Sequence, residues 1–179
     1  MLVYHSGFQI IKEPDVTYGR KNADFGQGFY LSDSLDFSLR WSRIRKEEKT
    51  YINTYALDLE GLSVVYLKRD PEWFSCIFDN RRLNDHYKEA DVVIGPIAND
   101  TIFDTLGIIT SGFLTAEEAL KMLSCGPEYT QITLKSEKAV SHLKWLSCRE
   151  VSPEEIEEYQ SSVKKEQEDY LNEISKILE

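Results

Sequence analysis

Three short clusters of residues in this chain carry side chains that could do chemistry. His5 ends an apolar, β-favouring segment and is followed by Ser6 and Gly7, Tyr30 lies in an aromatic segment, and Gln131 opens a late β-favouring segment. An imidazole, a phenol and an amide can together hold a polar, partly aromatic ligand. Each residue alone also has an ordinary structural explanation, because strand-end histidines are mostly structural and a tyrosine among aromatic neighbours mostly packs in the core.

Two glycines precede Tyr30, but they do not form a dinucleotide fingerprint. Gly26 and Gly28 come before their strand, whereas the glycines of a Rossmann motif follow a strand and open a helix. The three cysteines and three histidines show no CxxC or metal-ligand spacing. We therefore expect neither a metal site nor a disulfide framework.

The strands that must position these clusters are predicted from apolar runs and turn signals. They are expected at 2–5, 28–31, 51–57, 62–67, 92–94, 131–134 and 144–148. We expect segments 51–57 and 62–67 to pair with each other around the turn at Glu60 and Gly61.

Helices are predicted from capping signals and from apolar residues at helical spacing. One helix is expected after the N-cap candidates at 32–34, with a buried face formed by Phe37, Trp41 and Ile44. Others are expected to begin at Pro71 and at the capping box that Thr115 forms with Glu118.

The charge of the chain is unevenly distributed. The net charge is -10, and residues 150–179 contribute ten acidic and three basic side chains to it. The preceding part is nearly neutral, and its charge neither favours nor forbids a nucleic-acid substrate.

No apolar run in the chain approaches the ~20 residues of a membrane span. The N-terminal residues do not have the pattern of a signal peptide. We expect a cytoplasmic protein without a membrane partner.

The acidic C-terminal segment, residues 151–179, is predicted to be one long helix after a domain spanning 1–150. Ser152, Pro153 and Glu155 form its capping signal. Apolar residues recur there every seven positions, at Ile156, Val163, Tyr170 and Ile177. Two interpretations remain open. The helix lies on the surface of its own domain, or it docks a partner or a second copy. In either case the capping signal and the change in charge predict a separable unit.

In their order and spacing the clusters resemble the His-Tyr-Glu class of ADP-ribosyltransferases, and more closely an uncharacterised bacterial family, DUF3990. The residues that carry the resemblance are His5 with Gly7, the DFGQGFYL block at 24–31, Trp41 with Arg43 and Arg45, the segment 93–98, and Gln131 with Ile132. The resemblance covers roughly residues 1–146. It implies an α+β fold, a split β-sandwich of two small antiparallel sheets around an NAD cleft, with flanking helices.

The resemblance also implies roles for individual residues. Tyr30 would stack on the cationic nicotinamide ring of NAD, and His5 would hold the adenosine-side ribose through the donor and the acceptor of a neutral imidazole. Arg20 or Lys21 would bind the phosphates, with a solvated loop charge as the ordinary alternative. Backbone groups after the histidine would grip the nicotinamide amide. The remaining predicted contacts of NAD are Ser6, Gly7, Gly28 and Asp100.

Two departures from the family pattern affect the predicted chemistry. Ser6 stands where the family has a glycine. Gln131 stands where the active class has a glutamate, and an amide cannot supply negative charge or act as a base. Asp91 or Asp100 could provide the missing carboxylate, although helix capping or surface exposure is the alternative for both.

The predicted function is NAD-dependent mono-ADP-ribosyl transfer by a bacterial toxin or effector, with NAD hydrolysis as a side reaction. His5, Tyr30 and Gln131 are the predicted catalytic residues, and the acceptor is a protein or a nucleic acid. An antitoxin or a second copy would bind the C-terminal helix. One alternative is a module that binds NAD or ADP-ribose without turnover. The other is a protein-interaction domain with a degenerate cleft.

Overall fold

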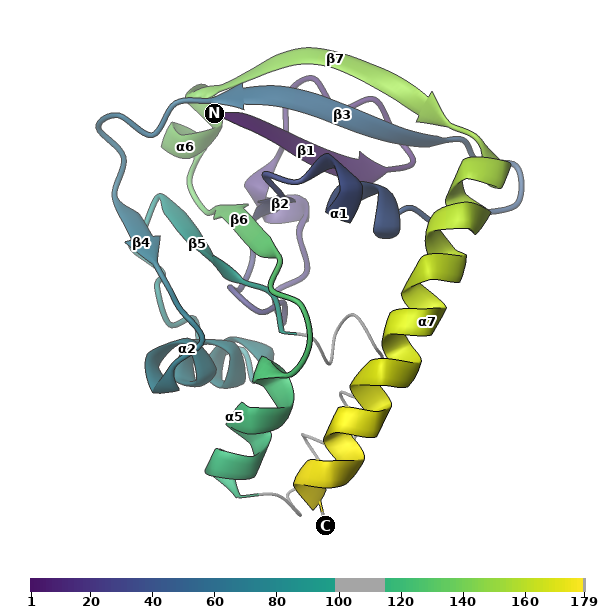
Figure 1. Ribbon diagram of the computed structural model, residues 1–179. Coiled ribbons are helices and arrows are strands. Elements are labelled where there is room, and N and C mark those ends of the chain that lie inside the picture. Colours follow the sequence, from purple (N-terminus) through teal and green to yellow (C-terminus); the bar gives the residue numbers. More distant parts are fainter. Residues whose placement is uncertain (99–114, 179) are drawn as a thin grey trace.

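A computed structural model describes residues 1–98 and 115–178 and shows an α+β fold with two sheets (Figure 1). The first sheet has the strand order β1-β3-β7. Its strands are β1 (Leu2–Gly7), β3 (Thr50–Leu57) and β7 (Leu143–Val151), and both pairings are antiparallel. Because β3 is the central strand, both of its edges are occupied.

The second sheet is mixed, which corrects the expectation of two antiparallel sheets. Its order is β2-β6-β5-β4, with β2 (Phe29–Leu31), β6 (Thr130–Leu134), β5 (Val92–Pro96) and β4 (Val64–Tyr66). The β4–β5 pair is parallel and is connected through helix α2 (Pro71–Arg81). The predicted pairing of 51–57 with 62–67 is therefore wrong, because β3 and β4 belong to different sheets.

The helices begin where their capping residues predict, but one ends early. Helix α1 (Leu35–Arg40) starts after the Ser34 cap and ends at Trp41, so Ile44 lies beyond it and is 47% exposed. The other short helices are η1 (Val16–Tyr18), α5 (Ala116–Ser124) and α6 (Glu137–Ser141), and α5 has the predicted Thr115–Glu118 capping box. The expected helix face therefore holds for Phe37, which is buried, and fails for Ile44.

The hydrophobic core consists of three clusters that hold the two sheets and the helices together. One cluster joins the sheets through residues such as Val3, Tyr55 and Ile132. A second lies between the other face of the mixed sheet and α2, α5 and the C-terminal helix, around Trp73. The third packs α1 against the first sheet through Leu39 and Ile52. Strand β2 contributes Phe29 to the first cluster, while Tyr30 packs on the second.

The C-terminal helix α7 (Pro153–Leu178) runs along its own domain from the end of β7 towards α5 (Figure 1). Three of its apolar side chains, Ile156, Tyr170 and Ile174, are almost completely buried in two of the core clusters. Only half of the predicted capping box forms, because Ser152 accepts from the Glu155 amide while the Glu155 carboxylate binds Arg149. The helix thus contributes side chains to the hydrophobic core of the domain. None of the described helices is long and apolar enough to cross a membrane.

Candidate functional site

Within residues 1–98 and 115–178, the two sheets meet at one isolated antiparallel bridge, which brings the first two clusters together. Tyr4 and Ser32 exchange backbone hydrogen bonds of 2.8 and 3.0 Å across this junction. His5 follows Tyr4 directly, and Tyr30 lies two residues before Ser32, so the bridge holds the end of β1 against β2. Residues 25 positions apart in the sequence therefore become neighbours in space.

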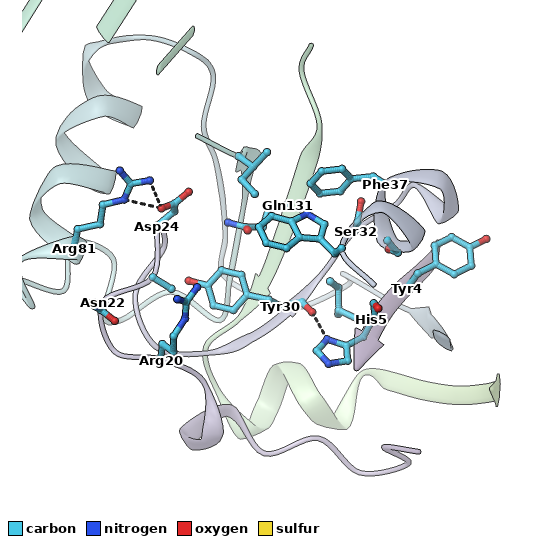
Figure 2. Close-up of a pocket in the computed structure, with 16 residues that line it drawn as sticks. Tyr4, His5, Arg20, Asn22, Asp24, Tyr30, Ser32, Phe37, Arg81 and Gln131 are labelled. Carbon is cyan, nitrogen blue, oxygen red and sulfur yellow. Dashed lines mark hydrogen bonds and ion pairs between the residues drawn. The ribbon is translucent and has the colours of Figure 1, made fainter. Parts of the chain in front are cut away.

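A cavity of about 430 Å³ opens beside this bridge, a size typical of small-molecule sites. Its sixteen lining residues come from β1, β2, α1, α2, β6, the loop before β2 and the residues that directly follow β2, α1 and β5. Figure 2 shows the Asp24–Arg81 pair at one end and His5 at the other, with Tyr30 and Gln131 between them. The structure thus brings the three predicted catalytic side chains into one cavity.

His5 is half-buried and has one of its two ring nitrogens committed to the protein. Its Nδ1 lies 2.8 Å from the carbonyl oxygen of Tyr30, and its ring stacks on Phe29 at 4.6 Å. Because a carbonyl oxygen only accepts, Nδ1 carries the proton and donates it. Burial lowers the pKa of His5, so the ring is neutral at pH 7 and Nε2 keeps its lone pair. The imidazole can therefore offer a ligand an acceptor, not the donor and acceptor that the sequence suggested.

The orientation of the Tyr30 ring is fixed by hydrogen bonds between its hydroxyl and residues of the same 24–31 block. Its hydroxyl donates to the carbonyl oxygen of Gly26 at 2.5 Å and accepts from the amide of Phe25 at 3.1 Å. Gly26 has a φ of +76°, a left-handed conformation that favours glycine, and this turn brings its carbonyl back to the phenol. Burial raises the pKa of Tyr30, so the hydroxyl stays protonated and keeps its donor. The ring is therefore preorganised before any ligand binds.

The loop before β2 is anchored to α2 by a buried ion pair. The Asp24 carboxylate accepts from Nε and Nη2 of Arg81 at 2.9 and 2.8 Å. The backbone carbonyl of Asp24 accepts from the side-chain amide of Asn80 at 3.0 Å. The second carboxylate oxygen accepts from the backbone amide of Ala98 at 3.3 Å. The cavity wall formed by Asp24 is therefore tied to β5 as well as to α2.

Gln131 presents a polar group that the described part of the chain does not satisfy. It lies on β6 opposite Gly95 of β5 and lines the cavity. Its side-chain Nε2 is buried and has no hydrogen-bond partner among residues 1–98 and 115–178. A buried donor without a partner costs roughly 1–3 kcal/mol, which a ligand acceptor would recover. Gln131 thus lines the cavity with a buried donor that the described residues leave unsatisfied.

Asp91, one of the two candidates for the missing carboxylate, is not among the residues that line the cavity. Asp91 lies at the opposite end of β5 and bonds Ser136 at 2.6 Å and the Ser63 amide at 2.9 Å. These bonds lower the pKa of Asp91 and tie β5 to α6 and to the segment before β4. Asp100 lies outside the described residues. The carboxylate that does line the cavity is Asp24, already paired with Arg81.

The other predicted contacts of NAD divide into two groups. Ser6 and the exposed Arg20 line the cavity, whereas Gly7, Lys21 and Gly28 are not among its lining residues. The glycines have packing roles instead. A Cβ on Gly28 would lie 2.5 Å from the carbonyl oxygen of Leu134 in β6, and one on Gly7 would lie 3.2 Å from Nε2 of His5.

Sequence reasoning missed several cavity residues, including Asp24, Arg81 and Ser32. Asp24 opens the DFGQGFYL block, so its place in the motif was a usable signal. Arg81 offered none, because it lies 57 residues away on α2 and reaches the cavity only through the fold. Ser32 looked like a helix cap, but its hydroxyl donates to the carbonyl of Thr130, next to Gln131.

Comparison with solved structures finds a similar fold in a chain of the crystal structure of the M. tuberculosis MbcT–MbcA toxin–antitoxin complex. The TM-score is 0.52 and the sequence identity 11%, over 89% of this chain and 88% of that chain. At this identity the similarity concerns the fold alone. Comparison with curated proteins finds no match.

A comparison with protein families identifies the relationship at the sequence level. The profile of the family described as "Protein of unknown function (DUF3990)" matches residues 1–145, which include every described residue of the cavity. The chain therefore belongs to the DUF3990 family.

Proposed function

We propose that this chain binds NAD in the cavity between β1, β2 and β6 and transfers ADP-ribose from it, as the toxin of a toxin–antitoxin pair. The observation that carries the proposal is the shared cavity of His5, Tyr30 and Gln131, contributed by three separate strands. The resemblance of their motifs to the His-Tyr-Glu class of ADP-ribosyltransferases supports the same assignment.

Tyr30 provides the surface for the nicotinamide ring. The ring of this substrate is cationic, and an aromatic face attracts a desolvated cation by roughly 1–2 kcal/mol. Because the Tyr30 hydroxyl is held by Gly26 and Phe25, little conformational freedom is lost when the ring stacks. This fixed orientation is the preorganisation that a binding site for a flat cation needs.

His5, Arg20 and Ser6 provide polar contacts for the rest of the dinucleotide. The free Nε2 of His5 accepts a hydrogen bond from a ribose hydroxyl, since Nδ1 is already committed to Tyr30. Arg20 is the cation of the exposed loop that lines the cavity, and a guanidinium suits a pyrophosphate. Lys21, the other cation considered from the sequence, does not line the cavity.

The transfer breaks the bond between nicotinamide and the ribose C1′. The electron pair of that bond leaves with the nicotinamide, which becomes neutral, while positive charge develops at C1′. An acceptor oxygen or nitrogen then bonds to C1′ and loses its proton to water, and water itself as acceptor gives NAD hydrolysis. Gln131 can orient a ribose hydroxyl, but it stabilises the developing charge only as a dipole. We therefore expect slow turnover.

The toxin assignment draws on the fold similarity to a chain of a toxin–antitoxin complex. An antitoxin is thus the expected protein partner. A chain that consumes NAD or modifies cell components would require such control.

A second candidate is a module that binds NAD or ADP-ribose without cleaving it. The observation that favours it is Gln131 itself, whose neutral amide replaces the catalytic glutamate and whose Nε2 is poised to donate to a ligand. Such a module would use the same cavity and the same Tyr30 surface.

Calorimetric titration with NAD and a nicotinamide-release assay on the same preparation test both candidates. Binding with slow release of nicotinamide supports the transferase, and binding without release supports the reader. Tyr30→Ala serves as the cavity variant and Tyr66→Ala, on an exposed face of β4, as its matched control. Absence of NAD binding to the wild type at millimolar concentration would contradict both.

A further inference from the structure

A second cavity, of about 230 Å³, lies between α1 and α7 and adjoins the first. Phe37 and Trp41 line both cavities, so these two rings form a common wall. The floor and sides of this groove, which we call the α1–α7 groove, come from α1, the residues that follow it, Tyr129 and the middle of α7.

Cationic side chains predominate in the α1–α7 groove, although the chain as a whole is acidic. Arg40, Arg43 and Lys164 line it together with one carboxylate, Glu166. Arg40 is neutralised by Glu166, with 2.6 Å to each carboxylate oxygen, and by Asp36 at 2.8 Å. Arg43 and Lys164 form no ion pair within the described part of the chain. Arg43 and Lys164 therefore remain available to an anionic ligand, and the charges of these two residues, Arg40, Asp36 and Glu166 sum to +1.

Flat surfaces accompany these charges. The guanidinium of Arg43 lies 5.6 Å from the centre of the Trp41 ring, and that of Arg40 lies 5.5 Å from the centre of the Tyr129 ring. Phe37 stacks on Tyr129 at 4.4 Å with an interplanar angle of 11°. Phe37 and Arg40 cover the Tyr129 ring, so the planes left to a base are the partly exposed Trp41 ring and the exposed guanidinium of Arg43. Such planes beside an unpaired cation, here Lys164, bind nucleotides of single-stranded nucleic acids through the bases and the phosphates respectively.

We propose that the α1–α7 groove binds a nucleotide of a single-stranded nucleic acid and presents it to the neighbouring cavity as the acceptor. An acidic protein segment would use the cations but not the flat surfaces, so the observations favour the nucleic acid. The inference rests on the proposed function, since the groove is assigned to the acceptor of the transfer.

In the transfer step a hydroxyl or amine of the nucleotide bonds to C1′ of NAD. The bond to nicotinamide breaks with its electron pair on the leaving group, and the proton of the acceptor passes to water.

Fluorescence anisotropy of short fluorescein-labelled single-stranded RNA and DNA, titrated with the full chain at low and at physiological salt, tests this inference. We expect binding that weakens with salt and a loss of about tenfold or more in the double variant Arg43→Ala/Lys164→Ala. The matched control is Arg82→Ala/Lys144→Ala, which removes two exposed charges that do not line the groove and should change the affinity less than about twofold. All four side chains are exposed, but Arg43 also donates to the backbone carbonyls of Arg40 and Ser42, so thermal unfolding of both double variants checks that the fold is retained.

Three results would overturn the inference: no binding of either oligonucleotide at low salt, equal losses in the two double variants, or displacement by poly-glutamate as effective as displacement by unlabelled oligonucleotide. The last result would mean that the groove recognises charge alone, as for an acidic protein. A parallel NAD titration separates this inference from the proposed function. NAD binding without oligonucleotide binding rejects only the groove assignment. Oligonucleotide binding without NAD binding rejects the proposed function and with it the acceptor role, and leaves the groove as a nucleic-acid site without the transfer.

Discussion

The imidazole of His5 donates a hydrogen bond from Nδ1 to the carbonyl oxygen of Tyr30, 2.8 Å away, across the junction of the two sheets. This bond assigns the tautomer and leaves Nε2 as the acceptor. It also couples the positions of His5 and Tyr30, because a shift of β2 would move the carbonyl oxygen that accepts the hydrogen bond from His5.

The stability of the protein should depend on His5 in slightly acidic solution. Burial lowers the pKa of His5 from its ordinary value of 6.5, so the unfolded chain binds more protons than the folded chain below that pH. The stabilisation is therefore complete above 6.5 and is lost progressively as the pH falls towards the pKa of the folded state. Urea midpoints at neutral pH and at pH values below 6.5 should show a steeper loss for the wild type than for His5→Asn. Equal losses in the two proteins would mean that other groups control the acid response.

The hydroxyl and the ring of Tyr30 should have separable effects. Tyr30→Phe leaves the Gly26 carbonyl and the Phe25 amide without their partner, which costs roughly 1–3 kcal/mol of stability, but it keeps the aromatic face. NAD affinity should change little. Tyr30→Ala also removes the face and should weaken NAD binding about tenfold. Thermal unfolding and calorimetric titration measure the two effects. Equal affinities of Tyr30→Ala and Tyr30→Phe would exclude stacking on this ring.

Gln131→Glu should convert slow turnover into faster turnover. A carboxylate at this position would stabilise positive charge at C1′, and one well-placed electrostatic group changes rates by about 10²–10³. Affinity for NAD should change only slightly, because the side chain keeps a hydrogen-bonding oxygen. Gln131→Met, which has similar size and no charge, is the control. A nicotinamide-release rate that falls in Gln131→Glu would show that Gln131 does not occupy the place of the catalytic glutamate.

The C-terminal helix should prove necessary for stability. Ile174 is 3% exposed in the cluster around Trp73, whereas Leu171, on the same helix, is 42% exposed. Ile174→Ala should cost about 2–5 kcal/mol, and Leu171→Ala much less. Deletion of residues 153–179 should abolish the cooperative thermal transition, since it also exposes the surface that Ile156 and Tyr170 cover. A truncated chain that melts cooperatively near the wild-type temperature would instead support the separable unit expected from the sequence.

Local sequence signals were sufficient for most of the secondary structure. The Thr115–Glu118 capping box, the helix start at Pro71 and the capping signal at Ser152 and Pro153 are local signals, and each predicted the start of its helix. The early end of α1 and the exposure of Ile44 were not predictable in this way. Apolar spacing indicates which face of a helix would be buried, not how far the helix continues.

Strand partners and the membership of the cavity depended on tertiary structure. The segments that form β3 and β4 are close in sequence and looked like a hairpin, but β1 and β7 occupy both edges of β3, so β4 pairs with β5 through a helical crossover. Which strands pair depends on all the strand edges that the fold makes available. A local sequence pattern does not show which of those edges other strands occupy.

Some features of the candidate site were likewise predicted from the sequence, whereas others required the folded structure. The resemblance carried by the motifs of His5, Tyr30 and Gln131 implied that the three residues share a cleft, and all three line one cavity. The Asp24–Arg81 pair, the loss of the His5 donor to Tyr30 and the exclusion of Asp91 required the folded structure. These features are contacts between elements far apart in sequence. Side-chain chemistry can be read from residue types, but burial, tautomer and pairing are determined only by the neighbours that the fold supplies.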